Sequence, residues 1–260
     1  MQDQIKYLAK LKGQKVLIIG GSAGIGYAAS EAAVEHGCEV HVSSSQQQRV
    51  EAAVQRLKQA YPSASSRISG HTCDMSDEAT LESNIVALFE AVGQLDHIVY
   101  TAGNAIMPTP IADATLEAMR AAATVRYTAP IFVAKHAPKF LRQAASSSIT
   151  LTTGVVSEKL IPGWSVTAGP RTAVQGLTRN LALDLRPIRV NAVCLGAVDT
   201  DTWSHMAPED KDKTFAALVQ KTTTGVIAQA SDVAEAYLYC MKDNNVTGSI
   251  IHTNGGVLLT

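Results

Sequence analysis

Three glycines near the start of the chain have the spacing of a phosphate-binding turn. Gly20, Gly24 and Gly26 form G-x-x-x-G-x-G in IGGSAGIGYAAS, between an apolar run and a helical pattern. Glycines permit a tight turn and let the backbone approach a pyrophosphate, whose charge then lies at the N-terminus of the next helix. The motif predicts a dinucleotide-binding site that includes Ser22 and Ile25.

The residues after the second apolar run bear on the choice of dinucleotide. Proteins that prefer NAD usually place Asp or Glu there, to accept from the ribose 2′-hydroxyl. This chain has Ser43, Ser44 and Ser45, followed by Arg49. Hydroxyls can donate to a 2′-phosphate and a guanidinium can pair with it, which favours NADP(H). The alternative is a serine helix cap with a solvated arginine.

A further acidic residue follows the third expected strand. HTCDMSD places Asp74 and Met75 at the end of that strand, beside the predicted cofactor. The carboxylate of Asp74 could accept from the adenine amino group. It could also cap the following helix, and the two roles are compatible.

The elements that must position these residues are visible as apolar runs that alternate with amphipathic stretches. The runs are rich in Val and Ile, which is typical of strands buried on both faces. Strand–helix alternation predicts one α/β domain over 1–260, a Rossmann-type doubly wound parallel sheet. The runs are 16–20, 39–43, 97–103, 148–154, 188–196 and 248–256.

Composition excludes several function classes. The net charge of −1 and the absence of charge blocks give no reason to expect nucleic acid or a membrane surface as partner. The chain has no apolar stretch of transmembrane length and no signal core near its first residue, so we expect a soluble, cytoplasmic protein. The scattered cysteines indicate buried small side chains and no metal site; they are Cys38, Cys73, Cys194 and Cys240.

Most of the chain resembles the short-chain dehydrogenase/reductase family. The resemblance is carried in order by LKGQKVLIIGGSAGIG, CDMSD, YTAG, RTAVQGLTRNLALDL and IRVNAVCLGAVDTDTW. It implies a nicotinamide cofactor and a small-molecule substrate. The remaining cofactor contacts that it implies are Ala102, Gly103, Arg171, Gly196, Val198 and Thr200.

The departures from the family pattern fall on the catalytic residues. The family uses Asn, Ser, Tyr and Lys, and these positions correspond here to Arg126, Gly154, Thr167 and Arg171. We therefore expect Arg126, Thr167 and Arg171 to carry whatever catalysis remains. Thr153 and Gly154 are expected beside the substrate.

A narrower resemblance is to fungal indole-alkaloid reductases of the malbrancheamide and paraherquamide type. TVRYTAP, TLTTG and IPGWS carry it. It implies reduction of an iminium by NADPH, coupled to a Diels–Alder cyclisation, in secondary metabolism. Those relatives have an arginine where Arg126 stands and an aspartate before Pro-Gly-Trp. Here Ile161 occupies the position of that aspartate.

The substituted residues limit the possible chemistry. Thr167 is too weak an acid to replace tyrosine, and Arg171 keeps its proton, so simple ketones should lose roughly 10²–10⁴-fold of general acid catalysis. Three alternatives stay open: reduction of an iminium, reduction of a conjugated carbonyl with arginine stabilising the oxyanion, and a non-redox cyclase, isomerase or cofactor-binding pseudoenzyme. Two arginines would repel an iminium unless an acid such as Glu158 neutralises them.

Two tryptophans are expected at the substrate entrance. Trp164 follows the fourth long apolar run and Trp203 begins the segment where the family carries a lid. They suit a bulky, aromatic substrate, or else they anchor their loops. His205 in the same segment could act as an acid or base.

The resemblance also implies self-association, as a homodimer or homotetramer. The helices expected around 115–142 and 166–186 lie where the family packs two copies together. Their apolar side chains could form a seam between copies or could face the sheet. These are Ala129, Val133, Ala173, Leu177 and Leu181.

Overall fold

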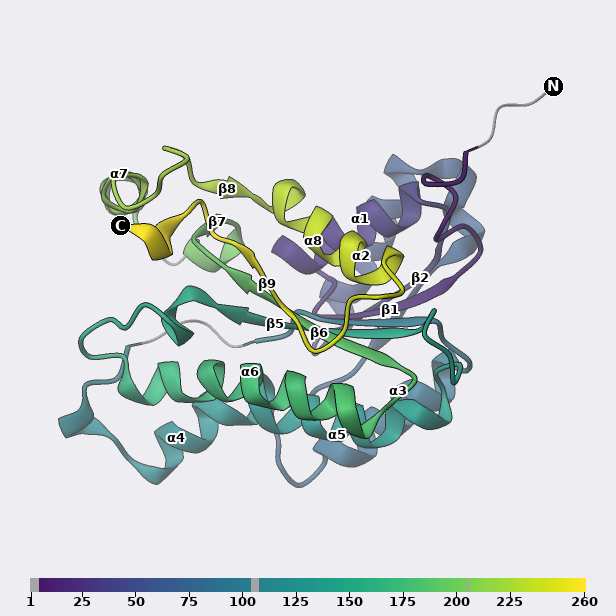
Figure 1. The fold of residues 1–260 in the computed structure, drawn as a ribbon, viewed down its shortest axis with the longest axis horizontal. Coiled ribbons are helices and arrows are strands. Elements are labelled where there is room, and N and C mark those ends of the chain that lie inside the picture. The colour runs from purple at the N-terminus through teal and green to yellow at the C-terminus, as the bar shows by residue number, and fades with distance from the viewer. Residues whose placement is uncertain (1–4, 104–107, 205) are drawn as a thin grey trace.

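The centre of the molecule is a parallel sheet of seven strands, in a computed structural model that describes residues 5–103, 108–204 and 206–260. The strand order is β3-β2-β1-β4-β5-β6-β9, and each neighbouring pair is parallel (Figure 1). The strands are β1 (Lys15–Ile19), β2 (Glu39–Ser44), β3 (Ile68–Thr72), β4 (His97–Tyr100), β5 (Ser148–Gly154), β6 (Arg189–Leu195) and β9 (Ile250–Thr253).

Helices cover both faces of this sheet, as expected for a Rossmann-type fold. One face carries α1 (Gly24–Glu35), α2 (Gln47–Ala60) and α8 (Ala230–Lys242). The other carries α3 (Leu81–Val92), α5 (Ala129–His136) and α6 (Ser165–Asp184). Outside these layers lie α4 (Leu116–Ala123), α7 (Pro208–Val219), a short pair β7 (Val198–Asp199) and β8 (Ala228–Gln229), and single turns at Pro62–Arg67, Ile111–Asp113, Thr124–Thr128, Ala137–Lys139, Val155–Ser157, Asp201–Trp203 and Val257–Leu259.

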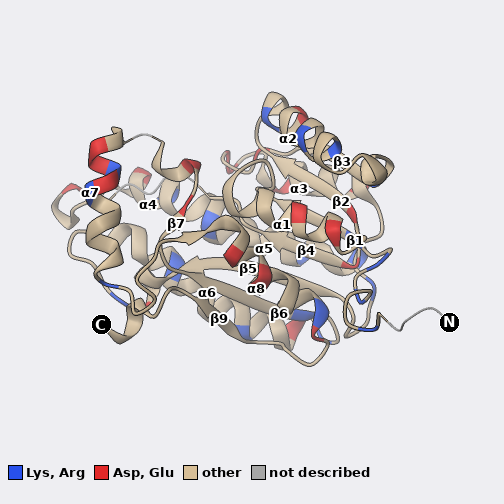
Figure 2. Ribbon diagram, turned by 90° about the horizontal axis from the view of Figure 1, so that it is seen from above, with Lys and Arg blue, Asp and Glu red and all other residues tan. Residues whose placement is uncertain are grey.

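The core consists of two apolar layers, one on each face of the sheet. In β1, Leu17 and Ile19 pack into one layer while Val16 and Ile18 pack into the other, because successive side chains of a strand point to opposite faces. Charged residues lie mostly on helices and loops, and the central strands are largely free of them (Figure 2). All four cysteines are free and buried, which confirms that they are small core residues.

The order of the strands determines where a ligand can bind. The chain leaves β1 toward β2 on one side, and β4 lies on the other, so the order reverses between β1 and β4. In open parallel sheets, ligands bind at the carboxyl ends of the strands beside such a reversal. That edge is at the left in Figure 1, below α7. Within the described part of the chain, no helix is both long and apolar enough to cross a bilayer.

Candidate active site

The glycine turn forms a narrow cradle at the end of β1. Gly20 has a φ of +89°, and a β-carbon there would lie 2.5 Å from the backbone nitrogen of Ala102. A β-carbon on Gly26 would lie 2.2 Å from the carbonyl oxygen of Gly20. Gly24, with a φ of +51°, begins α1. Side chains at these positions would fill the cradle or distort the turn.

The N-terminus of α1 is open toward this cradle. Its N-cap residue, Ala23, offers no side-chain cap, and the first turn contains no acidic residue. The first amide groups of a helix lack partners within the helix and carry a partial positive charge. The turn therefore provides what a phosphate group needs, as the glycine spacing predicted.

The serines after β2 differ from one another. Ser43 is fully buried, its hydroxyl has no partner, and its carbonyl oxygen accepts from the amides of Gly20 and Gly21 at 2.8 and 3.1 Å. Ser43 thus supports the turn and cannot reach a 2′-phosphate, which corrects one expectation. Ser44 and Ser45 lie at the accessible end of β2, and Arg49 is exposed on the first turn of α2.

None of these serines caps α2, so the alternative role proposed for them is wrong. The N-cap of α2 is Gln46, without a side-chain hydrogen bond. Asp74 likewise does not cap the next helix: its Oδ1 accepts from the amide and hydroxyl of Ser76 at 2.9 and 2.8 Å, whereas α3 begins only at Leu81. Met75, beside it, is buried.

Arg126 lies in a single π-helical turn between α4 and α5. The turn spans Thr124–Thr128, and the amide of Ala129 donates to the carbonyl of Thr124. Pro130 has no N–H to donate to the carbonyl of Arg126, so a regular α-helix cannot continue through this point. Single π turns occur frequently at functional sites. This widened turn was not predicted, although Pro130 was a signal for it.

The guanidinium of Arg126 packs against the chain at the end of β4. A β-carbon on Gly103 would lie 2.5 Å from its Cζ and Nη1. Burial lowers the pKa of Arg126, an effect that Tyr100 partly opposes. The structure thus brings Arg126 together with Ala102 and Gly103, the residues expected near the cofactor.

Arg171 lies nearby on the inner face of α6. The residue is buried, with 5% of its surface exposed, and Nη1 donates to the carbonyl of Thr167 at 2.6 Å. Its own carbonyl oxygen accepts from the hydroxyl of Thr153 at 2.7 Å, which ties α6 to the end of β5. Burial, and then the positive charge of Arg126, lowers the pKa of Arg171 to about 9. Both arginines therefore contribute to one site.

Tyrosines near the site are engaged elsewhere. The hydroxyl of Tyr100 donates to the carbonyl of Val125, and that of Tyr237 bonds with the hydroxyl of Thr152 at 2.8 Å. Burial raises the pKa of both phenols, which makes them weaker acids. At Gly154, a β-carbon would meet only the carbonyl oxygen of Leu195, at 3.7 Å, so the end of β5 has free space.

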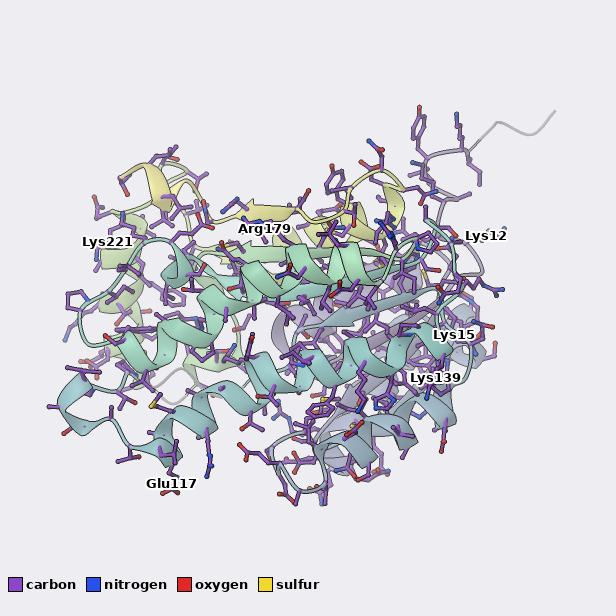
Figure 3. All side chains as sticks on the ribbon, turned by 60° about the horizontal axis from the view of Figure 1, so that its bottom comes forward. Lys12, Lys15, Glu117, Lys139, Arg179 and Lys221 are labelled. Carbon is purple, nitrogen blue, oxygen red and sulfur yellow. The ribbon has the colours of Figure 1, made fainter. Side chains whose placement is uncertain are left out.

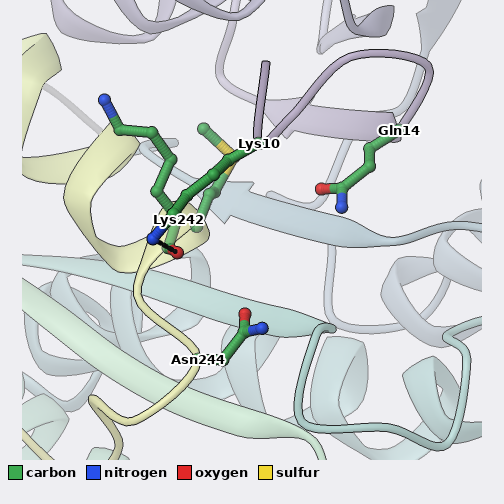
Figure 4. A pocket seen from close by; sticks show the side chains of 5 residues that line it. Lys10, Gln14, Lys242 and Asn244 are labelled. Atoms are coloured by element: carbon green, nitrogen blue, oxygen red, sulfur yellow. Dashed lines mark hydrogen bonds between the residues drawn. The ribbon is translucent and has the colours of Figure 1, made fainter. Parts of the chain in front are cut away.

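An apolar cavity of about 280 Å³ lies between α4 and α6. It is lined by Ile111, Ala114, Met119, Ala123, Ser165, Val166, Gly169 and Pro170. On α6, Thr167 and Arg171 are buried, whereas Ser165, Val166, Gly169 and Pro170 border this cavity. A second cavity, of about 160 Å³ between Lys10 and Lys242, is near the start of β1, away from the carboxyl ends of the strands (Figure 4).

The two tryptophans differ in how they are held. Trp203 Nε1 donates to the carbonyl of Val198 at 2.8 Å, and its ring packs edge-on against Phe215 of α7, 5.3 Å between centroids. Trp203 therefore anchors its loop, which is the second of the two roles considered for it; the first was contact with an aromatic substrate. Trp164 is half-buried at the start of α6. His205 falls outside the described residues.

The remaining expected cofactor contacts lie at the same edge. Thr200 approaches the glycine turn: a β-carbon on Gly24 would lie 3.2 Å from its Cβ. Gly196 packs against Asn254, whose Cα would lie 2.8 Å from an added β-carbon. Val198 is buried in β7. These residues lie at the same edge of the sheet as the glycine turn.

Comparison with known proteins identifies the family of this chain. The family model described as "SDR-like rossmann domain" matches residues 7–260. The short-chain dehydrogenase/reductase fsr5 of Gibberella fujikuroi is 42% identical over 260 residues, which cover 98% of both chains. The chain belongs to the short-chain dehydrogenase/reductase family.

Solved structures of short-chain dehydrogenases/reductases agree with this assignment. The MalC reductase/Diels-Alderase of Malbranchea aurantiaca is 39% identical with a TM-score of 0.93, over 98% of this chain and 100% of that one. A small-chain dehydrogenase solved in complex with NADPH is 29% identical, with a TM-score of 0.78 over 96% and 100%. The protein is an oxidoreductase of this family, and its expected resemblance to malbrancheamide-type proteins is confirmed.

Glu158 does not reach the arginines of this short-chain dehydrogenase/reductase. Its Oε1 accepts from His252 Nε2 at 2.9 Å and from Gln175 Nε2 at 2.7 Å. These contacts, the one to His252 first, hold the pKa of Glu158 below its usual value. Potential metal-ligand atoms of Glu158, Cys194 and His252 lie within 4.8 Å of one another. Glu158 is thus a partly exposed, hydrogen-bonded acid and not a counter-ion of Arg126 or Arg171.

The apolar residues expected at a seam between copies are mostly internal. Ala129, Val133 and Leu181 are buried in the core layer under α5 and α6. That confirms the alternative in which they face the sheet. Leu177 packs against the same layer and Ala173 is half-buried. The exposed apolar residues of α4, α5 and α6 are instead Leu116, Met119, Ile131 and Leu183.

Proposed function

We propose that the protein is an NADP(H)-dependent reductase of an activated C=O or C=N bond in a bulky, partly aromatic secondary metabolite. One observation carries this proposal: the guanidinium groups of Arg126, which is half-buried, and Arg171, which is buried, lie beside a glycine cradle fitted for a dinucleotide. The similarity to the MalC reductase/Diels-Alderase of Malbranchea aurantiaca supports the reaction class.

The residues present fit NADP(H). The cradle of Gly20, Gly24 and Gly26 and the open N-terminus of α1 would hold the pyrophosphate. Ser44, together with Arg49, would take the 2′-phosphate. Adenine and nicotinamide contacts are assigned to Ser22, Ile25, Ser45, Asp74, Met75, Ala102, Gly103, Arg171, Gly196, Val198 and Thr200. The relative solved with NADPH supports this choice of cofactor.

The chemistry divides between the cofactor and the arginines. When bound, the cofactor supplies a hydride. Arg126 and Arg171 stabilise the negative charge that develops on the substrate oxygen, in a partly buried site where such charges interact more strongly than in water. Thr167 contributes its carbonyl oxygen, which orients Arg171. The proton that the product requires comes from water, because the phenols of Tyr100 and Tyr237 are engaged.

The electrostatics favour C=O over C=N as the reducible bond. An iminium is a cation, and two nearby guanidinium groups repel it. Glu158 does not offset this charge, since its carboxylate is bonded to His252 and Gln175. A conjugated carbonyl, in contrast, gains negative charge as hydride arrives.

A second candidate is a non-redox cyclase or isomerase that retains the cofactor site. It is favoured by the relative MalC, whose structure is described as that of a reductase and Diels-Alderase. A cofactor-binding pseudoenzyme is the remaining alternative. Trp164 and the apolar cavity beside α6 would hold an aromatic substrate in either case, with Thr153 and Gly154 beside the reacting atoms.

The experiment measures binding and chemistry separately. NADPH binding is followed by the change in its fluorescence. Conjugated ketones, cyclic iminium salts and simple ketones are then incubated with NADPH that carries deuterium at the transferred position, and products are analysed by mass spectrometry. We expect deuterium transfer to conjugated ketones in preference to iminium salts. Tight NADPH binding without transfer to any of them would support the pseudoenzyme or cyclase and contradict a reductase.

A further inference from the structure

The guanidinium of Arg171 has more hydrogen-bonding capacity than the protein uses. An arginine carries five N–H donors, and here one nitrogen, Nη1, bonds to the carbonyl of Thr167 at 2.6 Å. Among the described residues, no carboxylate forms an ion pair with Arg171. The residue is nevertheless buried. A buried charge without a counter-ion costs several kcal/mol, so such an arrangement calls for a bound anion.

A second positive charge acts at the same place. The charge of Arg126, after burial, is what depresses the pKa of Arg171. With a pKa of about 9, Arg171 stays protonated at pH 7. Two like charges in a partly desolvated site raise the electrostatic potential there, and an anion that binds between them relieves their repulsion.

The structure also indicates what is attached to this anion. Thr167 and Arg171 lie on the inner face of α6, while Val166 and Pro170 line the apolar cavity on its outer side. Space at Gly154 adjoins the inner face, because the hydroxyl of Thr153 is bonded to the carbonyl of Arg171. A ligand that binds Arg171 and extends to this cavity would combine an anionic group with an apolar body.

We propose that Arg171, together with Arg126, binds an anionic oxygen group of the substrate, a carboxylate or the oxygen of an acidic β-dicarbonyl, next to the reducible bond. This inference rests on the proposed function, which it narrows to acidic substrates. Arg171 forms the bidentate contact that a planar guanidinium offers to two oxygens.

The test compares two probes of the same shape and different charge. Benzoate and benzamide are titrated calorimetrically into protein saturated with NADPH. We expect benzoate to bind at least tenfold more tightly than benzamide, with an affinity that weakens as salt is added. Arg171→Gln should abolish the preference for benzoate. Arg179→Gln, which changes an exposed arginine on the same helix, should leave it unchanged (Figure 3).

Two results would overturn the inference. Equal affinities for benzoate and benzamide would do so directly. Weaker NADPH binding in Arg171→Gln, with no benzoate bound by the loaded wild type, would assign the arginine to a cofactor phosphate instead. If Arg171→Gln does not fold, Arg171→Lys keeps the charge and loses the fork, so benzoate should bind at least threefold more weakly. If wild-type protein fails to bind NADPH, the proposed function fails, and the benzoate comparison in cofactor-free protein still decides whether an anion site exists.

Discussion

The guanidinium of Arg126 lies directly over Gly103, so close that a methyl group on residue 103 would meet it at 2.5 Å. The two residues come from different parts of the fold: Gly103 follows β4, and Arg126 sits in the π turn before α5. Because residue 103 has no side chain, the guanidinium of Arg126 can occupy the space beside it. The contact connects the nucleotide-binding edge to the proposed catalytic residue.

Replacing Gly103 by alanine should move Arg126 without unfolding the protein. The displaced atoms are the flexible end of a long side chain, so we expect the melting temperature to change by only a few degrees. Turnover should fall at least tenfold, because a small misplacement of a catalytic group is costly. The measurement is a thermal melt with a steady-state rate. Ala168→Ser, on the inner side of α6, serves as a control of similar size.

Removing the charge of Arg126 should reduce turnover far more than stability. We expect Arg126→Ala to bind NADPH with near-normal affinity and to lose roughly 10²-fold in rate, as for one lost oxyanion donor. Arg126→Lys should not recover the rate, since a point charge cannot reproduce the guanidinium fork. A purely structural role would show the reverse, with a lower melting temperature and normal turnover of the folded fraction.

Arg49 should decide the preference for NADPH over NADH. It is exposed on the first turn of α2, and it makes no hydrogen bond or ion pair among residues 5–103, 108–204 and 206–260. Arg49→Ala should weaken NADPH binding by about 1.5–3 kcal/mol, roughly 10- to 150-fold, and leave NADH binding unchanged. Fluorescence titration with both cofactors measures this. Equal losses for the two would place Arg49 away from the 2′-phosphate.

His97 should make the protein less stable in acid. Its Nδ1 lies 2.8 Å from Ser148 Oγ and its Nε2 lies 2.6 Å from Gln14 Oε1, which suits a neutral ring that donates through Nε2. Burial lowers the pKa of His97 from 6.5 to about 3. Between these values the unfolded chain binds a proton that the folded protein excludes, so the free energy of unfolding falls as pH decreases, by up to about 1.4 kcal/mol per unit.

The variant His97→Gln isolates that contribution. Burial also lowers the pKa values of His41 and His71, so part of the acid sensitivity remains in it. We expect urea unfolding curves measured between pH 7 and 4 to show a smaller dependence on pH than for the wild type. An unchanged slope would show that His97 accepts its proton in the folded state.

Self-association should occur through α4, α5 and α6. Exposed apolar side chains on these helices leave a surface that water solvates poorly, and Leu183 is 66% exposed. We propose a homodimer or homotetramer in solution, measured by light scattering at micromolar concentration. Leu183→Arg should lower the measured mass. A monomeric wild type would contradict the proposal.

The fold was predictable because its strands are buried on both sides. Continuous apolar runs marked β1, β2, β4, β5 and β6 to within three residues at each end. The edge strand β3 lacks such a run, since only part of it is covered by helices and its burial alternates. Its position was inferred from the motif HTCDMSD, which begins near its end.

The site was predictable only in part. The glycine turn follows from local spacing, and its geometry agreed with the prediction. The direction of Glu158, the burial of Ser43 and the anchoring of Trp203 depend on contacts between distant segments, such as His252 with Glu158. Sequence periodicity carries no information about such contacts.

The placement of the two tryptophans gives the protein a built-in optical reporter. The chain contains two, Trp164 at the start of α6 and Trp203 against Phe215 of α7. Indole emission overlaps the absorption of reduced nicotinamide, so bound NADPH should quench it by energy transfer. Because the ring of Trp203 packs against Phe215 of α7, a displacement of α7 changes the surroundings of that indole. Stopped-flow fluorescence could therefore separate two events. Trp203→Phe, which keeps Trp164, would report mainly the arrival of cofactor, and Trp164→Phe, which keeps Trp203, would report the motion of α7.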